Sequence, residues 1–265
     1  MTLTLIPIDH GELCHGWAWT IEDEDLLAER VARIVLGQYR HVMKILSGAG
    51  VPGPIANTEQ ANAAIKQLTL TTGADPWHRD GWLFQTISWI AAHQQPSASL
   101  TRMPHIRKAD KGFDGLQLDL NAEGTTITAV VVFEDKATDN ARDTIRDDVW
   151  PGIVALERGE RLNELSQEVS GMLDAYAAAD PGFDLDSAIA NTLWHEVRHY
   201  RISITIGDTH NHEAARAGLF KGFDDSAPGA AARRRADTIY LPALRSWMEG
   251  FADRVIGKIT AIGGV

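Results

Sequence analysis

Two periodicities among the apolar residues predict a chain that alternates between helical and extended segments. Apolar side chains recur at helical spacing through 21–48 and again through 77–93. The same reasoning predicts further helices near 58–69, 139–158, 160–178, 184–198 and 239–260. Glycine and proline interrupt these helices at 48–54 and at 180–182. Helices therefore dominate the expected content of the chain.

The extended segments are rich in β-branched residues or alternate between apolar and polar positions. They predict strands near 99–107, 113–120, 125–133 and 200–206. An Asn-Ala-Glu-Gly turn at 121–124 joins the middle two strands into a hairpin. We therefore expect an α/β protein with a mixed β-sheet flanked by helices. Residues 1–72 are expected to form a helical N-terminal extension, packed as one compact unit with an α/β domain of residues 73–265.

Three charged residues are expected to meet at one end of this hairpin. Glu134 and Lys136 end the second strand two residues apart, so both point to the same sheet face. With a connection at 121–125, Asp114 lies across from Val132, diagonal to Glu134 and on its face. The same register pairs the other positions of that face as Leu116 with Val130, Leu118 with Thr128, and Leu120 with Thr126.

Two carboxylates beside an ammonium group suit divalent-metal and phosphate chemistry. Mg²⁺ takes oxygen ligands, commonly one or two carboxylates, and keeps positions for water and phosphate oxygens. The metal lowers the pKa of a bound water and stabilises negative charge in the transition state. A lysine beside it can orient that water or neutralise the developing charge. The alternative is a solvated strand end at which Glu134, Asp135 and Lys136 face water.

This arrangement resembles the PD-(D/E)xK nuclease superfamily, which has the restriction-endonuclease-like fold. Asp114 matches the first acid, Glu134 the second and Lys136 the lysine, while Phe113 replaces the usual proline. The predicted order of helix, three strands, helices and strand across about 77–206 resembles the αβββαβ core of that superfamily. The resemblance implies a nuclease that hydrolyses DNA in a bacterial defence or restriction system. Asp114 and Glu134 would hold Mg²⁺ or Mn²⁺, and Lys136 would position the attacking water.

The resemblance also points to auxiliary residues. In many members of the superfamily the first helix contributes an acid or amide to the metal site, and Gln85, followed by Asp80, is the candidate here. Arg142 stands on the helix predicted after Lys136, near an N-terminus that could meet a phosphate. Ordinary surface positions, or intrahelical ion pairs for the arginine, are the alternative.

The net charge of −11 argues against a strong unaided grip on DNA, because DNA-binding faces are normally basic. Arg107, Lys108 and Lys111 form a basic patch immediately before Asp114, and we expect them to contact DNA. The arginines at 233–235 form a second patch. Either patch could instead be solvated surface. The acidic remainder indicates that a helicase or another partner protein supplies DNA affinity.

Composition places few further limits on the function. Contents of 44% hydrophobic and 23% charged residues are ordinary for a globular protein. The single cysteine, Cys14, excludes an internal disulfide framework. The sequence shows no signal-peptide pattern and no apolar run of membrane-spanning length. We therefore expect a cytoplasmic protein that does not bind membranes.

A competing motif lies at residues 195–199, where His-Glu-Val-Arg-His is a literal HExxH. This pentapeptide resembles that of zinc metalloproteases, in which both histidines bind zinc from one helix. A strand pattern begins at Tyr200, so the helix is expected to end at His199, which favours a role in helix-end packing. A zinc metalloprotease using His195, Glu196 and His199 is the alternative function. A non-catalytic interaction subunit with a degenerate nuclease fold is a third.

Overall fold

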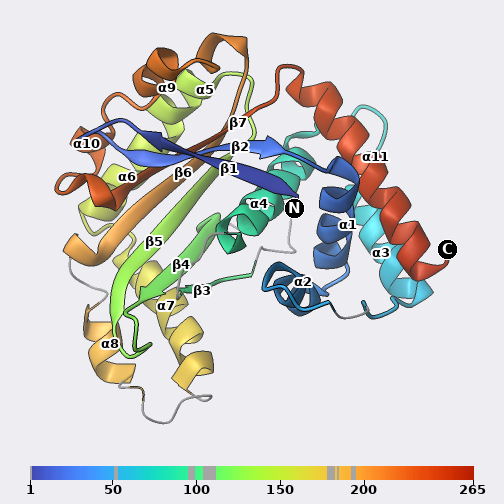
Figure 1. The fold of residues 1–265 in the computed structure, drawn as a ribbon, viewed down its shortest axis with the longest axis horizontal. Helices are drawn as coiled ribbons and strands as arrows, with labels where there is room; N and C mark the ends of the chain where they lie inside the picture. The colour runs from blue at the N-terminus through green and yellow to red at the C-terminus, as the bar shows by residue number, and fades with distance from the viewer. Residues whose placement is uncertain are drawn as a thin grey trace.

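The computed structural model describes residues 2–50, 53–94, 99–103, 112–177, 183, 185–191 and 195–265. Within these residues, seven strands form one sheet in the order β1-β2-β7-β6-β5-β4-β3 (Figure 1). Their bounds are β1 (Leu3–Asp9), β2 (His15–Ile21), β3 (Ser99–Thr101), β4 (Gly115–Leu120), β5 (Ile127–Lys136), β6 (Arg198–Ile206) and β7 (Arg234–Tyr240). Strands β2, β7, β6 and β5 run parallel, whereas the pairs β1–β2, β4–β5 and β3–β4 are antiparallel.

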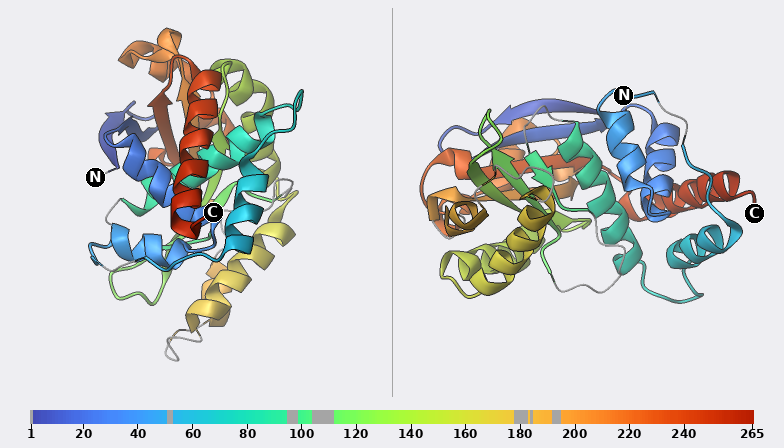
Figure 2. Two further views of the ribbon diagram at one scale, coloured as in Figure 1. Left: turned by 90° about the vertical axis from the view of Figure 1, so that its right-hand side faces the viewer. Right: turned by 90° about the horizontal axis from the view of Figure 1, so that it is seen from below.

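Helices cover both faces of the sheet, as Figures 1 and 2 show. Those before β3 are α1 (Glu24–Val35), α2 (Tyr39–Leu46), α3 (Thr58–Leu68) and α4 (Trp77–His93). Between β5 and β6 lie α5 (Ala141–Thr144), α6 (Trp150–Glu157), α7 (Leu162–Ala177) and α8 (Leu185–Asn191), with a π-helical segment at Ile145–Val149. The remaining helices are α9 (Glu213–Leu219), α10 (Phe223–Ser226) and α11 (Leu244–Gly263). None of the helices described combines the length and apolar character needed to cross a membrane.

Strand β5 is covered on both faces, and its side chains alternate between a large hydrophobic cluster on one face and a small one on the other. Val130 and Val132 pack with the helices that follow β5, whereas Val131 and Phe133 point to the other face and pack with Ala92 of α4. Successive residues of a strand point to opposite faces, so a strand covered on both sides must be apolar at nearly every position. This explains the unbroken apolar run in the second half of the hairpin.

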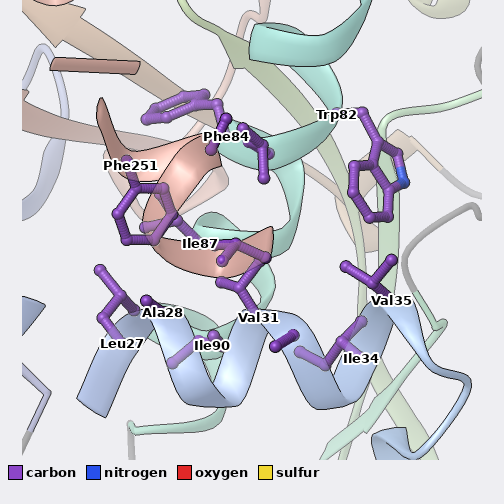
Figure 3. Packing of buried hydrophobic residues seen from close by; sticks show 14 of the residues in the cluster. Leu27, Ala28, Val31, Ile34, Val35, Trp82, Phe84, Ile87, Ile90 and Phe251 are labelled. Carbon is purple, nitrogen blue, oxygen red and sulfur yellow. The ribbon is translucent and has the colours of Figure 1, made fainter. Parts of the chain in front are cut away.

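A separate hydrophobic core joins distant parts of the chain. Leu27 and Val31 of α1 lie against Ile87 of α4 and Phe251 of α11 (Figure 3). Each of these side chains is fully buried, and burying one such side chain contributes about 1.5–3 kcal/mol. The core therefore crosses the predicted boundary at residue 72 and ties the beginning of the chain to its end.

The predicted class, a mixed α/β protein with helices on both sides of the sheet, is confirmed. The expectation that residues 1–72 are helical is wrong for its first part, because β1 and β2 form an antiparallel hairpin there. This hairpin extends the sheet by parallel pairing of β2 with β7, more than two hundred residues later in the chain. A Cβ on Gly16 would lie 2.0 Å from the carbonyl oxygen of Ala236, so the close approach requires glycine.

The later part of the chain also departs from the prediction. Strand β6 begins at Arg198, two residues before the expected start, and of the helix expected at 184–198 the structure describes α8 at Leu185–Asn191 and a 3-10 turn at His195–Val197. Arg234 and Arg235, which the sequence places in a basic patch at 233–235, are the first two residues of strand β7. The final helix begins at Leu244 rather than near residue 239, because β7 occupies those positions.

Candidate active site

The β4–β5 hairpin sets the position of the candidate site. Leu116 pairs with Val132 and Leu118 with Val130, so the predicted register is wrong by two residues. The difference arises because the connection extends to Thr126 and a bulge lies between Asp119 and Leu120. A shift of two residues keeps every side chain on its predicted face, and it brings Asp114 level with Glu134.

Lys136 joins the two carboxylates. Its ammonium nitrogen lies 3.1 Å from Oδ2 of Asp114 and 2.9 Å from Oε2 of Glu134. The side chain of Asp114 is 19% exposed, that of Glu134 14% and that of Lys136 26%. The cluster therefore reaches the surface but is mostly enclosed. The convergence expected from the sequence is therefore present at the end of β5.

Two further groups hold Asp114 in place. The backbone N–H of Asp135 donates to Oδ2 of Asp114 at 2.8 Å. The side-chain amide of Gln85, from α4, donates to Oδ1 at 2.6 Å. Both carboxylate oxygens are thus oriented by protein donors. Gln85 therefore lies beside Asp114, and its role as an auxiliary site residue stays a prediction.

Burial and charge shift the protonation of the cluster in opposite directions. Burial raises the pKa of Glu134, the ammonium of Lys136 opposes that shift, and the charge of Asp114 adds to it. For Lys136, burial lowers the pKa, but Glu134 and Asp114 together outweigh burial and raise it above its ordinary value. Lys136 is therefore a cation at neutral pH, able to donate hydrogen bonds and unable to accept a proton.

The donor set fits a hard divalent cation. Its charged oxygens come from Asp114 and Glu134, and both approach the same ammonium nitrogen, which occupies the position of a cation between them. Gly152 of α6 lies beside this carboxylate, since a Cβ added there would lie 3.8 Å from Oε1 of Glu134.

Asp80, the second auxiliary candidate, is not part of the cluster. It is fully buried and forms ion pairs of 2.9 Å with Arg79 and 2.8 Å with Arg245. Arg245 also binds Asp139 and the carbonyl oxygen of Ala137, just after β5. The physical role of Asp80 is to anchor the start of α4 to α11, which corrects the expectation from the sequence.

Of the four residues expected to contact DNA, only Arg142 lies among the described residues. Arg107, Lys108 and Lys111 lie outside the described residues. Nη1 of Arg142 donates to the carbonyl oxygens of Leu219 and Lys221, at 2.7 and 3.0 Å. Arg142 therefore ties its helix to the end of α9, and contact with DNA stays a prediction for this residue.

The expected second basic patch is internal. Arg233 and Arg234 are 7% and 3% exposed. The guanidinium of Arg234 donates to four backbone carbonyl oxygens, including those of Glu12 and Leu13 at 2.6 Å each. Arg235 pairs with the buried carboxylate of Asp237 at 2.8 Å. These arginines fasten the N-terminal segment and β7 together, which leaves them unsuited to bind phosphate.

The zinc motif lacks the geometry that it needs. Residues 195–197 form a single 3-10 turn, and His199 lies in β6, paired with Val131 of β5. The two histidines therefore do not share a continuous helix, which is the arrangement that places them on one metal. Glu196 and His199 instead line a hollow of about 740 Å³ at the opposite end of β6 from the carboxylates.

Arg161 is a residue of the site region that the sequence analysis missed. It precedes α7, and its guanidinium carbon lies 4.4 Å from the ring centroid of Phe113, the neighbour of Asp114. In the sequence it is one basic residue among several in a turn between two helices, so no local pattern distinguishes it.

No family model, curated protein or solved structure matches the chain.

Proposed function

We propose that this chain is a Mg²⁺-dependent nuclease that hydrolyses phosphodiester bonds in DNA. The observation that carries the proposal is the contact of one ammonium group, that of Lys136, with the carboxylates of Asp114 and Glu134. Acids on two adjacent strands, with a lysine two residues after the second, form the pattern on which the resemblance to PD-(D/E)xK nucleases rests.

The order of elements around the cluster supports this proposal. Helix α4 is followed by the antiparallel strands β3, β4 and β5, then by helices α5 to α8, and then by β6, which runs parallel to β5. This order is similar to the helix, three strands, helix and strand expected of an αβββαβ core, and it supports the proposal. Gln85 lies on the first of these helices, where many superfamily members carry an auxiliary site residue.

The residues divide the chemistry among them. Asp114 and Glu134 would hold Mg²⁺ or Mn²⁺, which would lower the pKa of the attacking water and stabilise charge on the phosphate. Lys136, a cation in this setting, would donate a hydrogen bond to that water or to a phosphate oxygen. Gln85 and the backbone N–H of Asp135 hold Asp114 in a fixed orientation. Pre-orientation of this kind is what makes such a cluster catalytic rather than merely charged.

Because the chain is acidic, its own affinity for DNA is expected to be weak. A net charge of −11 repels the DNA backbone over distances of about a Debye length, roughly 8–10 Å at physiological salt. We therefore include in the proposal a partner protein, such as a helicase, that brings the DNA to the site.

Removal of either side chain at the end of β5 tests the function. Glu134→Ala or Lys136→Ala should abolish Mg²⁺-dependent DNA cleavage, because one change removes a metal ligand and the other removes the local cation. The measurement is single-turnover cleavage of labelled single- and double-stranded DNA at high protein concentration, with thermal melting to verify that each variant folds. Glu196→Gln is the matched control, since Glu196 lines a separate hollow before the start of β6, and it should cut like the parent.

Two results would overturn the assignment. Undiminished cutting by either variant would show that the cluster is not the active site. A parent protein that neither cuts nucleic acid nor binds Mg²⁺ would point instead to a non-catalytic interaction subunit. Metal analysis of the purified protein tests the remaining alternative, a zinc metalloprotease, because stoichiometric zinc would favour that function.

A further inference from the structure

Helix α4 exposes one narrow stripe of its surface. From Trp77 to Ala92 every residue is buried except Trp77, His78, Gly81 and Gln85. Residues spaced by four and by seven positions lie on one side of a helix, so these exceptions form a continuous stripe. The buried residues of α4 pack into the core shared with α1 and α11 and against β5. The stripe is therefore the part of α4 that is open to a ligand.

The stripe leads to the candidate active site. At one end Gln85 donates to Asp114 at 2.6 Å. At the other end Trp77 lies eight residues earlier, which is about 12 Å along the axis of an α-helix. Between them, a Cβ added to Gly81 would meet no atom of the described residues within 4 Å. The stripe is therefore uncovered at Gly81 as well as at Trp77.

The beginning of α4 is held beside the end of β5. Asp80 of α4 pairs with Arg245 at 2.8 Å, and Arg245 donates to the carbonyl oxygen of Ala137, directly after β5, at 3.1 Å. Together with the contact of Gln85, this fixes α4 at two points along its length. Trp77 therefore has a set position relative to the carboxylates.

The indole of Trp77 is 68% exposed, and its chemistry suits a nucleic-acid base. Every base has a flat π-face on which an aromatic side chain can stack, and stacking needs no positive charge on the protein. This matters in a chain of net charge −11, for which contacts to phosphate contribute little. In a duplex the faces of the bases are already stacked on one another, so an exposed ring favours a single strand.

We propose that Trp77 stacks on a base of a single DNA strand that runs along this stripe to the carboxylates. The inference rests on the proposed nuclease function and deepens it by naming the substrate class, single-stranded DNA, and a residue that selects it. A distance of about 12 Å corresponds to roughly three to four nucleotides at about 3.4 Å per nucleotide of a stacked strand. The stacked base therefore lies within about four nucleotides of the scissile bond.

The test maps where a labelled single strand is cut when it carries one abasic nucleotide. In the parent, cleavage should fall at one fixed offset from the abasic position, within about four nucleotides, because the ring finds no base there. Trp77→Ala and Trp77→Leu should abolish this gap in the cleavage pattern. Their affinity for the intact strand, measured in Ca²⁺ in place of Mg²⁺, should fall about 5- to 150-fold, the range of base–aromatic stacking. Trp77→Phe should keep the gap, because it keeps a ring.

Matched variants separate stacking from charge and from stability. Gly81→Glu places a carboxylate in the path of the strand and should weaken binding, whereas Gly171→Glu adds the same charge at an equally open position of α7 and should not. Tyr240→Ala removes another exposed ring, at the end of β7, and should leave the cleavage pattern unchanged. Thermal melting should change little in the Trp77 variants, because the ring is mostly exposed.

The outcomes distinguish this inference from the function on which it rests. A parent that cuts DNA without such a gap, or a Trp77→Ala variant that shows the same gap, overturns the role of Trp77 and leaves the nuclease intact. Equal losses of affinity for a single strand and for a duplex in Trp77→Ala overturn the selection of single strands. A parent that cuts no nucleic acid overturns the function itself, and this inference with it.

Discussion

Asp135 connects the two faces of the sheet at the candidate site. Its backbone N–H holds Asp114 on one face, while its buried carboxylate accepts a hydrogen bond from Ser88 of α4 at 2.6 Å on the other. Gln85, three residues before Ser88 on the same helix, reaches Asp114. A single residue between Glu134 and Lys136 therefore fixes the helix and the first carboxylate relative to each other.

Asp135 should make the free energy of unfolding depend on pH. Burial raises its pKa to about 7, with the charge of Arg201 opposing the shift. The unfolded chain releases this proton near pH 4, so the folded chain holds it more tightly between these values. Stabilisation from this group is therefore complete below pH 4 and is lost as the pH rises to about 7.

Asp135→Asn tests this dependence, because asparagine keeps the hydrogen-bond acceptor and cannot ionise. The free energy of unfolding of the parent minus that of the variant should fall as the pH rises from 5 to 7, and should then stay constant. Urea denaturation at each pH is the measurement. A difference that stays level throughout this range would contradict the shift.

At the scale of elements, the β4–β5 hairpin is the part whose packing most directly sets the site. Gly115 follows Asp114 and pairs with Phe133, and a Cβ there would lie 2.6 Å from the Phe133 ring. Only a residue without a side chain lets this ring cover the beginning of β4. The position of Asp114 therefore depends on a glycine that performs no chemistry.

Gly115→Ala should destabilise the protein by about 1–3 kcal/mol, because the ring or the strand must move to admit the methyl group. It should also lower the cleavage rate by displacing Asp114. Gly171→Ala in α7 is the matched control, since no atom lies within 4 Å of the added Cβ and alanine favours a helix interior by up to about 1 kcal/mol. Equal stabilities of the two variants in urea denaturation would refute the packing argument.

For the nuclease proposed above, the charge of the whole molecule limits the strength of DNA binding. The net charge of −11 leaves little general attraction for phosphate, and the described arginines at 233–235 are engaged inside the protein. Binding should therefore depend on a few local cations near the site. The three basic residues immediately before Asp114 are the candidates that the sequence offers.

Replacing Arg107, Lys108 and Lys111 together with alanine should weaken DNA binding and flatten its salt dependence. Each lost phosphate contact lowers the slope of log K against log salt by about 0.9 for B-form DNA. Fluorescence anisotropy over a series of salt concentrations measures both quantities. Unchanged affinity and slope would identify this patch as solvated surface, whereas tight binding by the parent alone at physiological salt would remove the need for a partner.

Several features could be predicted from the sequence because they depend only on local periodicity. Helical spacing placed α3, α4 and α7 close to their observed bounds, and alternation placed Glu134 and Lys136 on one sheet face with Asp114. A strand has a period of two, so even a register error of two residues left the face of Asp114 unchanged. The convergence of the cluster followed from this periodicity.

The folded structure was needed to reveal the features that depend on contacts between residues far apart in the chain. The β1–β2 hairpin is part of the sheet because β2 pairs with β7. Arg234 is buried because its guanidinium donates to four backbone carbonyl oxygens. His199 belongs to β6 because β5 and β7 pair on either side of that strand. Arg161 lies over the ring of Phe113 because the turn before α7 packs on that residue. Contacts of this kind have no local period, so only the folded chain reveals them.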